Sequence, residues 1–452
     1  MPFPARVFKA YDIRGLSPAE IDENFAYRLG CVFPEYAKAR IVVVGRDTRQ
    51  TSPAIAAALV DGLLTGGAKI VEVGLVSTPL FYFGVAKDHA HEAGIMVTAS
   101  HNPASYNGFK LVRAGAGPIG GQEMQTIRRL MEESSGTRTR ASGRQIAVLD
   151  VKEDYLKTLF SLVEKEKIQG LRLGVDAGNG MAGVILPQLF ERLSVEVFPL
   201  YLEPDGTFPH HEANPLKEET LKELKTLVRN QQAHLGAAYD GDADRVGLVD
   251  ETGTSVPADL LATLLVSDLL RQHPGSTVLF DLRSSRVYQE EVERLGGRAV
   301  MSRVGHSFIK SQLKESGAVF AFELAGHYYF KNFPGVECPD LFLLMVLARL
   351  AAAGRSLSEL IAPFKKYFHS GEINFEVADK ERIIEELERQ YGSQGKLIKI
   401  DGLRVDFDEW WFSVRPSNTE PLLRLNLEAA SRELMEEKRA ELSELIEIKR
   451  LS

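Results

Sequence analysis

The chain has 452 residues, of which 44% are hydrophobic and 26% are charged, and its formal net charge is −8 at pH 7. A chain of this length exceeds what one hydrophobic core usually supports, so we expect roughly two to four domains. The acidic balance argues against nucleic acid or an anionic membrane as a partner, because such partners require a field of basic side chains.

The cysteine content and the apolar segments indicate a cytoplasmic protein. Cys31 and Cys338 are too few for a disulfide framework in a chain of this length. The N-terminal segment MPFPARVFKAYDIRG lacks the apolar run of a secretory signal. The densest apolar stretch, residues 341–353, is interrupted by Arg349 and is shorter than the roughly 20 residues that span a bilayer. We expect it to form a buried helix.

The first two thirds of the chain alternate strand and helix patterns. A β-branched run at residues 41–44, a helical apolar pattern at residues 53–64 and a strand pattern at residues 69–73 predict a βαβ unit. The alternation restarts with strand patterns at residues 171–176 and 277–281. We therefore expect three α/β domains in tandem.

The last part of the chain changes character. Strand patterns at residues 375–378, 410–414 and 422–428, a charged helix near residues 381–389 and a final helix predict a smaller α+β domain. A Ser/Thr/Gly/Arg-rich segment at residues 134–144 separates the first two units. The predicted domains are residues 1–146, 147–251, 252–365 and 366–452.

Ser100 is the first candidate for chemistry. It lies in the segment TASHNP at residues 98–103, directly after a strand pattern, and the carboxyl ends of strands are where α/β sheets place their reacting groups. A serine hydroxyl is a poor nucleophile without a base or a cation, and His101, Lys110 or a nearby metal would supply that help. The same hexapeptide also fits an ordinary Ser/Asn turn.

Three carboxylates, Asp240, Asp242 and Asp244, alternate with small residues after a second strand pattern. In an extended segment alternate side chains project to one side, so these three converge on one hard cation. A calcium loop is one alternative, because Glu251 stands at the position of its last ligand, but Arg245 replaces the glycine that this loop requires and the flanks read as strands. A solvated turn is the other alternative.

Two further loops carry groups suited to a phosphosugar. Glu323 and His327 flank a glycine turn, and a carboxylate can accept hydrogen bonds from two neighbouring sugar hydroxyls. The segment RPSNTEP, which begins at Arg415, combines a guanidinium with hydroxyl and amide donors, an inventory that suits a phosphate. Each loop taken alone also fits a structural turn.

The four segments together resemble the α-D-phosphohexomutase superfamily, and most closely its bacterial phosphomannomutase/phosphoglucomutase branch. They occur in the family's order over nearly the whole chain. Further segments agree with the family at residues 9–15, 44–49, 175–180, 204–209 and 303–306. The resemblance implies an α/β fold of four domains around a central cleft, to which each domain contributes one motif.

The resemblance also implies the roles of single residues. Ser100 matches the family's phosphoserine, and Asp240, Asp242 and Asp244 match its Mg²⁺ ligands, with a phosphoserine oxygen as a further ligand. Glu323 and His327 match the sugar-recognition loop. The loop that holds the non-reacting phosphate is matched by Arg415, Ser417, Asn418 and Thr419. The remaining positions that line the family's cleft are occupied by Tyr11, Arg14, His101, Lys110, Arg245 and His306.

Three positions bear on the substrate. Asn418 favours this branch over the phosphoglucosamine mutases, which usually have glycine there. Ala325 stands where the family usually has a serine beside the sugar, and Arg283 stands where it usually has a lysine. The first departure affects the sugar preference, and the second affects one cation that contacts the substrate.

The function implied is a mutase that interconverts hexose 1-phosphates and hexose 6-phosphates through Ser100 and a hexose 1,6-bisphosphate intermediate, which also serves as activator. Arg14, Lys110, Arg245 and Mg²⁺ neutralise charge, and Lys110 and His101 are the candidates for proton transfer. Mannose and glucose stay open as substrates.

The alternatives are a phosphatase that uses the same phosphoserine and a catalytically silent phosphosugar-binding or regulatory protein. The sequence does not determine the oligomeric state, and we take a monomer as the expectation.

Overall fold

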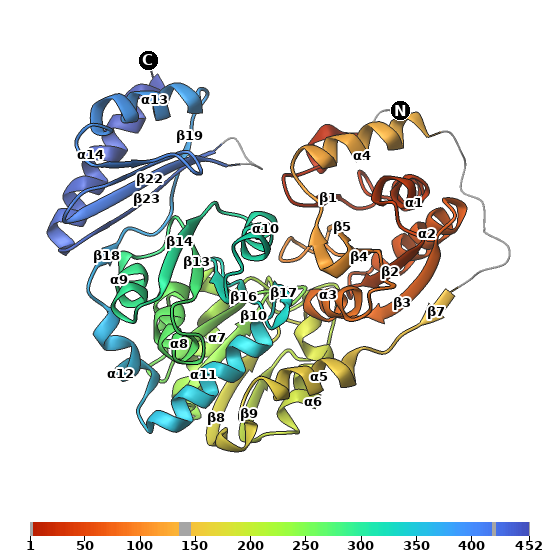
Figure 1. Cartoon of the computed structure of the whole chain (residues 1–452), viewed down its shortest axis with the longest axis horizontal. Helices are drawn as coiled ribbons and strands as arrows, with labels where there is room; N and C mark the ends of the chain where they lie inside the picture. The colour runs from red at the N-terminus through yellow and green to blue at the C-terminus, as the bar shows by residue number, and fades with distance from the viewer. Residues whose placement is uncertain (1–2, 135–145, 418–421, 452) are drawn as a thin grey trace.

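The computed structural model describes residues 3–134, 146–417 and 422–451 of the chain. Its strands form four separate sheets. Figure 1 shows four units that follow one another along the chain, with the C-terminal unit standing apart at the upper left and the N-terminal unit at the right. The expected α/β fold with four domains is confirmed.

The first domain is a mixed sheet with helices packed against it. Its strands and helices are β1 (Ile13–Leu16), β2 (Ile41–Arg46), β3 (Lys69–Leu75), β4 (Ala93–Val97), β5 (Tyr106–Arg113), β6 (Gly117–Pro118), β7 (Ile146–Val148), α1 (Glu23–Ala37), α2 (Ser52–Thr65), α3 (Thr78–Lys87) and α4 (Gln122–Glu133). The sheet order is β1-β5-β4-β2-β3-β7, with β6 beside β5. Strand β4 is parallel to β2 and antiparallel to β5. The loop after β4 and the middle of β5 therefore lie close together, and they carry Ser100 and Lys110.

The second domain presents the acidic motif at a hairpin. Its elements are α5 (Lys152–Ser161), β8 (Gln169–Asp176), α6 (Leu186–Phe190), β9 (Ser194–Leu200), α7 (Lys222–Asn230), β10 (Leu235–Tyr239), β11 (Val246–Asp250) and β12 (Ser255–Val256). The sheet order is β12-β11-β10-β8-β9. Strands β10 and β11 are antiparallel neighbours, with Tyr239 opposite Val246. Their connection carries the three aspartates.

The third domain places two site segments at one edge of its sheet. Its elements are α8 (Ala258–Gln272), β13 (Thr277–Asp281), α9 (Arg286–Arg294), β14 (Arg298–Ser302), α10 (His306–Ser316), β15 (Phe320–Phe322), β16 (Tyr328–Phe330), β17 (Phe333–Glu337), α11 (Pro339–Ala353) and α12 (Leu357–Ile361). Strand β13 is parallel to β15. Arg283 follows β13, and the Glu323–His327 turn follows β15, so both emerge at the carboxyl ends of adjacent strands.

The fourth domain is an antiparallel sheet covered by two long helices (Figure 1). Its elements are β18 (Phe368–His369), β19 (Ile373–Glu376), α13 (Lys380–Tyr391), β20 (Lys396–Ile398), β21 (Leu403–Asp406), β22 (Trp410–Pro416), β23 (Leu422–Ala429) and α14 (Arg432–Leu451). Strand β22 pairs with β23 so that Arg415 lies opposite Arg424. Short 3₁₀ helices elsewhere in the described chain lie at Ala5–Val7, Ala114–Ala116, Lys165–Lys167, Met181–Val184, Glu218–Leu221 and Ala362–Phe364.

The hydrophobic cores divide the molecule differently from the sheets. One continuous core joins the first three domains and includes Val43, Tyr155 and Phe322. The fourth domain has its own core, which includes Trp410 and Leu425. Its contact with the third domain includes polar bonds, such as the one that the Arg286 amide donates to Glu428 Oε1 at 3.1 Å.

Most of the predicted elements are present. The βαβ unit at residues 41–73 is confirmed as β2, α2 and β3, and β13 has the predicted bounds of residues 277–281. The apolar stretch at residues 341–353 lies in the buried helix α11. The strand predicted at residues 375–378 begins earlier, at Ile373, because its pairing with β23 starts there. Among the described residues, no single helix is long and apolar enough to cross a membrane, whereas α11 and the following Leu357–Phe364 segment together pass that test but are bent by 96°.

Asp340, at the start of α11, provides a test of how the domains pack. It is 2% exposed and accepts a hydrogen bond from the Tyr155 hydroxyl of the second domain at 2.6 Å. Burial raises the pKa of Asp340 to about 6. Folding raises the pKa of Asp340, so the native protein holds its proton more tightly than the unfolded chain does. The stability that this carboxyl group contributes at low pH is therefore lost as the pH rises through its folded-state pKa.

We therefore expect Asp340→Asn to gain stability relative to the natural chain as the pH rises. Between about pH 5 and about pH 8 the difference in free energy of unfolding should shift by about 1 kcal/mol in favour of the variant. Urea unfolding of both proteins at the two pH values measures this shift. Asp268→Asn, at a half-buried position of α8, is the matched control. A pH-independent difference for Asp340→Asn would contradict the prediction.

Candidate active site

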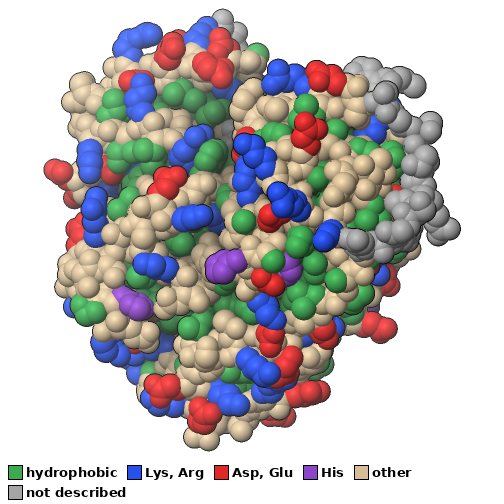
Figure 2. Space-filling model, turned by 45° about the vertical axis from the view of Figure 1, so that its right-hand side comes forward, with side chains coloured by type: hydrophobic (Ala, Val, Ile, Leu, Met, Phe, Trp, Pro, Cys, Tyr) green, Lys and Arg blue, Asp and Glu red, His purple; other side chains and the backbone are tan. Residues whose placement is uncertain are grey.

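One cavity of about 1330 Å³ is lined by residues of all four domains. Figure 2 shows the molecule hollowed between its two upper lobes, with basic side chains along the hollow. The predicted site residues that line the cavity are Tyr11, Arg14, His101, Arg245, Arg283, His306, Glu323, Ala325, His327, Arg415 and Ser417. The central cleft implied by the resemblance is therefore present. The predicted residues Asn418 and Thr419 lie outside the described part of the chain.

Ser100 is buried beside His101, which lines this cavity. Its side chain is 1% exposed, its backbone has a left-handed φ of 51°, and its Oγ lies 3.0 Å from Asp240 Oδ2 and 3.1 Å from His101 Nδ1. Gly241 lies against it: a Cβ on Gly241 would stand 2.4 Å from the Ser100 carbonyl oxygen. The glycine between the first two aspartates thus allows the serine loop and the acidic loop to meet. Ser100 itself lines a second cavity of about 120 Å³, which His101 shares.

The acidic motif converges for a different reason from the one predicted. The segment after β10 is a tight turn and not an extended strand, and Ala243 has a φ of 60°. Asp240 Oδ1 accepts hydrogen bonds from the amides of Asp244 at 3.1 Å and Arg245 at 3.2 Å. The turn folds back on its first carboxylate, which is how the side chains of Asp240, Asp242 and Asp244 come together.

The three carboxylates form a site that fits a hard cation. Asp240, Asp242 and Asp244 are at most 1% exposed, and each offers an oxygen within 4.8 Å of the others. Burial and the two neighbouring aspartates raise the pKa of Asp240 to about 8. Asp242 Oδ1 is buried with no hydrogen-bond partner among the described residues. An all-oxygen donor set with an orphaned buried oxygen suits Mg²⁺, which prefers carboxylate ligands.

Lys110 lies inside the acidic cluster. Its Nζ is 2.6 Å from Asp242 Oδ2 and also contacts Asp244. Burial alone would lower the pKa of Lys110, but the two aspartates raise it. In this arrangement Lys110 is a cation and not a proton acceptor. His101 differs, because burial and the adjacent Arg245 and Arg14 hold its pKa well below the usual range.

Two arginines face the serine from other segments. Arg14 in β1 forms an ion pair with Asp12 at 2.7 Å and donates to Asn102 Oδ1 at 2.8 Å. Arg245 places its Nε 3.1 Å from His327 Nε2 and 3.7 Å from Asp240 Oδ2. Both guanidinium groups line the cavity, so the serine end of the cavity is cationic where it opens to the substrate space.

The Glu323–His327 turn is built as a buried network. Glu323 accepts hydrogen bonds from the Gly305 amide at 2.8 Å and the Tyr329 hydroxyl at 2.7 Å, and it lies 3.0 Å from His327 Nδ1. Its burial opposes ionisation, but these partners lower the pKa of Glu323. Burial opposes protonation of His327, but Asp244, at 3.2 Å, and Glu323 raise its pKa to about 9. The carboxylate is thus largely engaged by protein donors before any sugar is present.

Tyr11 of the first domain and the other site residues of the third domain complete this wall. The Tyr11 hydroxyl donates to the Val304 carbonyl at 2.9 Å, and its ring lies edge-on to that of His306. Burial and the nearby Lys310 lower the pKa of His306. Arg283 forms an ion pair with Asp281 at 2.6 Å, and Ala325, whose side chain is a methyl group, lines the cavity.

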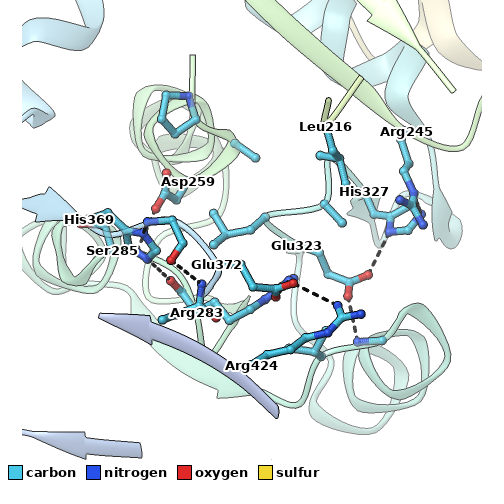
Figure 3. A pocket seen from close by; sticks show the side chains of 18 of the residues that line it. Leu216, Arg245, Asp259, Arg283, Ser285, Glu323, His327, His369, Glu372 and Arg424 are labelled. Carbon is cyan, nitrogen blue, oxygen red and sulfur yellow. Dashed lines mark hydrogen bonds and ion pairs between the residues drawn. The ribbon is translucent and has the colours of Figure 1, made fainter. Parts of the chain in front are cut away.

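Arg415 marks the end of the cavity that belongs to the fourth domain. It is 4% exposed, and burial and the neighbouring Arg283 lower its pKa. Ser417 follows it, with its amide bonded to the Leu422 carbonyl at 2.8 Å. Figure 3 shows the cationic groups of this end, Arg283 and Arg424, pointing toward Glu372 between them.

Arg49 supports the serine loop and was not assigned a role from the sequence. It is 1% exposed. Its guanidinium donates to the carbonyl oxygens of Ser100 at 2.8 Å, Asn102 at 2.6 Å, Pro103 at 2.6 Å and Tyr106 at 2.9 Å. Four bonds from one rigid group hold the loop in place, including the left-handed Ser100. The only sequence signal was the agreement of residues 44–49 with the family.

Thr78 supports the acidic loop in a similar way. From the first turn of α3 it donates through Oγ1 to Asp242 Oδ2 at 2.5 Å and through its amide to the Asp242 carbonyl at 2.9 Å. The first domain therefore fixes the middle aspartate of the second. Nothing in the local pattern around Thr78, which resembles a helix start, indicates this contact.

Comparison with known proteins agrees with this geometry. The sequence matches four successive domain descriptions of phosphoglucomutase/phosphomannomutase: alpha/beta/alpha domains I, II and III at residues 5–138, 153–253 and 257–367, and the C-terminal domain at residues 372–445. A phosphomannomutase of Methanocaldococcus jannaschii is 38% identical over 97% of each chain. A phosphomannomutase/phosphoglucomutase of Pseudomonas aeruginosa is 38% identical over 96% of this chain and 94% of that protein.

A solved structure shows the same arrangement of domains. The phosphoglucomutase/phosphomannomutase family protein of Burkholderia thailandensis superimposes with a TM-score of 0.91 at 30% identity, covering 99% of this chain and 98% of that one. The four domains of the family follow one another in this chain, and the relatives match it over nearly their full length. The chain belongs to the phosphoglucomutase/phosphomannomutase family.

Proposed function

We propose that this protein interconverts hexose 1-phosphates and hexose 6-phosphates by moving a phosphoryl group through Ser100. The observation that carries the proposal is the position of Ser100. Its Oγ lies 3.0 Å from Asp240 of the acidic cluster and 3.1 Å from His101, and His101 lines the same cavity as Arg415. Such a cavity has a reacting end and a phosphate-binding end, as a substrate with two phosphorylation positions requires.

The reaction begins with phosphorylated Ser100. The bond from its oxygen to phosphorus breaks as the free hydroxyl of a phosphosugar bonds to phosphorus, and the proton of that hydroxyl passes to the Ser100 oxygen. The product is a 1,6-bisphosphate. The bisphosphate turns round in the cavity, and Ser100 takes back the other phosphoryl group. Arg14, Arg245 and Lys110 hold and neutralise the transferred group, since phosphoryl transfer depends mainly on positioning and charge. His101 Nδ1 lies 3.1 Å from Ser100 Oγ and is the candidate for carrying this proton.

Asp240, Asp242 and Asp244 would hold Mg²⁺, together with a phosphoserine oxygen. The ion, when bound, neutralises negative charge on the phosphoryl oxygens. Its position beside Lys110 and Arg245 would place several cations around one phosphoryl group. The carboxylates that attract these cations are themselves held by Thr78 and by the amides of their own turn.

We propose mannose and glucose as the sugars of the substrate, and these two differ only in the orientation of the 2-hydroxyl group. Glu323 and His327 face the cavity, and we propose that Glu323 binds hydroxyls that mannose and glucose share, with Ala325 adding no hydrogen bond. Coupled assays with mannose 1-phosphate, glucose 1-phosphate and glucosamine 1-phosphate, each with its 1,6-bisphosphate, test the proposal. Release of inorganic phosphate in place of a 6-phosphate would identify a phosphatase. A cytoplasmic monomer, and domain divisions near residues 146, 251 and 365, stay predictions.

Ser100 should carry phosphate in the purified protein, because the resting enzyme must already hold the group that it donates. Peptide mapping by mass spectrometry should locate one phosphoryl group on Ser100. Ser100→Ala should lack it and should lose mutase turnover. Full activity of Ser100→Ala, or stoichiometric phosphate on another residue, would show that the nucleophile is misassigned.

Asp242→Asn should abolish Mg²⁺ binding while the fold is kept, because the amide has nearly the same shape but no charge. Calorimetric titration with Mg²⁺ should show binding to the natural chain and none to the variant. Turnover should fall by about two orders of magnitude. Asp268→Asn serves again as the control. Mg²⁺ binding by Asp242→Asn with the natural affinity would exclude the carboxylate cluster as the metal site.

Arg49→Lys should lower kcat without changing KM for the phosphosugar, because one ammonium cannot reach four carbonyl groups and the serine loop loses its alignment. A fall of about tenfold to a hundredfold in kcat is expected. Steady-state kinetics of Arg49→Lys and of the control Arg46→Lys, at a position where the arginine donates one bond to the Asp47 carbonyl, separate the two parameters. An unchanged kcat, with or without a change in KM, would contradict the prediction.

A further inference from the structure

Glu372 places a carboxylate where the cavity is otherwise cationic. Its Oε2 lies 3.0 Å from Arg415 Nη2 and 3.6 Å from Arg283 Nη1, and its Oε1 lies 3.1 Å from Arg424 Nη1. The side chain is 27% exposed and lines the cavity, whereas that of Arg415 is 5% exposed. Figure 3 shows Glu372 between Arg283 and Arg424. One carboxylate thus bridges three guanidinium groups.

The three arginines come from two domains, and Glu372 contacts arginines of both domains. Arg415 and Arg424 face each other across β22 and β23 of the fourth domain. Arg283 belongs to the third domain. Glu372 follows Gly371, which has a φ of 71°, and lies between β18 and β19 at the start of the fourth domain. Its ion pairs therefore link the third domain to the phosphate-binding end of the fourth.

Three guanidinium groups gather around Glu372. Asp281 engages Arg283 through Nε at 3.2 Å and Nη2 at 2.6 Å, and Nη1 is directed to Glu372. Arg415 lies close enough to Arg283 and Arg424 for both to lower its pKa, after the effect of burial. Cations gathered in this way attract a phosphate dianion. The same guanidinium nitrogens cannot bind a phosphate oxygen and the Glu372 carboxylate at one point, because the two anions repel each other.

We propose that Glu372 is an internal counter-anion of the phosphate-binding end: it occupies the arginines when no substrate is bound, and its charge weakens their hold on phosphate. This inference rests on the proposed function, which assigns Arg415 to the non-reacting phosphate. A mutase must release that phosphate in every cycle so that the bisphosphate can turn round. A carboxylate that competes for Arg415 and Arg424 makes the release easier.

Binding of inorganic phosphate tests the inference without reference to turnover. Glu372→Gln removes the charge and keeps the shape, and calorimetry should show phosphate binding about three- to tenfold tighter than in the natural chain. Glu376→Gln, an exposed position on β19 that does not line the cavity, is the matched control and should not differ from the natural chain. In an Arg415→Gln background the further change Glu372→Gln should have little effect, since the competition requires that arginine.

Kinetics give a second measurement. Glu372→Gln should lower KM for the 1-phosphate and the 6-phosphate alike, and less free bisphosphate should escape per turnover. Unchanged or weaker phosphate binding by Glu372→Gln would overturn the inference, as would an equal gain with and without Arg415. A natural chain that binds phosphate but turns over no hexose phosphate would instead refute the proposed function, so the two failures are distinguishable.

Discussion

The buried acidic cluster is the constraint on which the rest of the site depends. Asp240, Asp242 and Asp244 bring negative charge into the interior within 4.8 Å, and isolated charges in such a position are very costly. The protein compensates from every side: Lys110 and Thr78 of the first domain bind Asp242, and His327 of the third domain lies 3.2 Å from Asp244. The demand for positive charge therefore holds three domains at one point, where a divalent cation fits.

The opposite end of the cavity has the opposite imbalance. There the guanidinium groups of Arg283, Arg415 and Arg424 gather, and two carboxylates, Asp281 and Glu372, offset part of their charge. The serine end needs a cation and the far end accepts an anion, which matches a substrate that presents a phosphate to each end in turn. The hydrophobic cores follow the same division, because the acidic end is built on the core shared by the first three domains and the arginines of β22 and β23 lie on the separate core of the fourth.

Rigid support of the reacting groups comes from residues that contact no substrate. Arg49 holds four carbonyl groups of the serine loop, and the glycine at position 241 lets the acidic turn approach that loop. Glu323 is engaged by the Gly305 amide and the Tyr329 hydroxyl, so its orientation is set before a sugar arrives. Such positioning is what phosphoryl transfer requires, because the enzyme contributes alignment and charge more than covalent chemistry.

The sequence by itself determined the α/β alternation, the smaller final domain and the four motifs that carry the charged and nucleophilic groups. These features are local: strand and helix periods, and the spacing of Asp240, Asp242 and Asp244, are visible within a few residues. The reason for the convergence of the aspartates was wrong, since a turn held by amide bonds brings them together and an extended strand does not. Only the tertiary structure decided that Arg49 supports Ser100, that Thr78 supports Asp242 and that Glu372 opposes Arg415, because these partners are 43 to 164 residues apart and meet through domain packing.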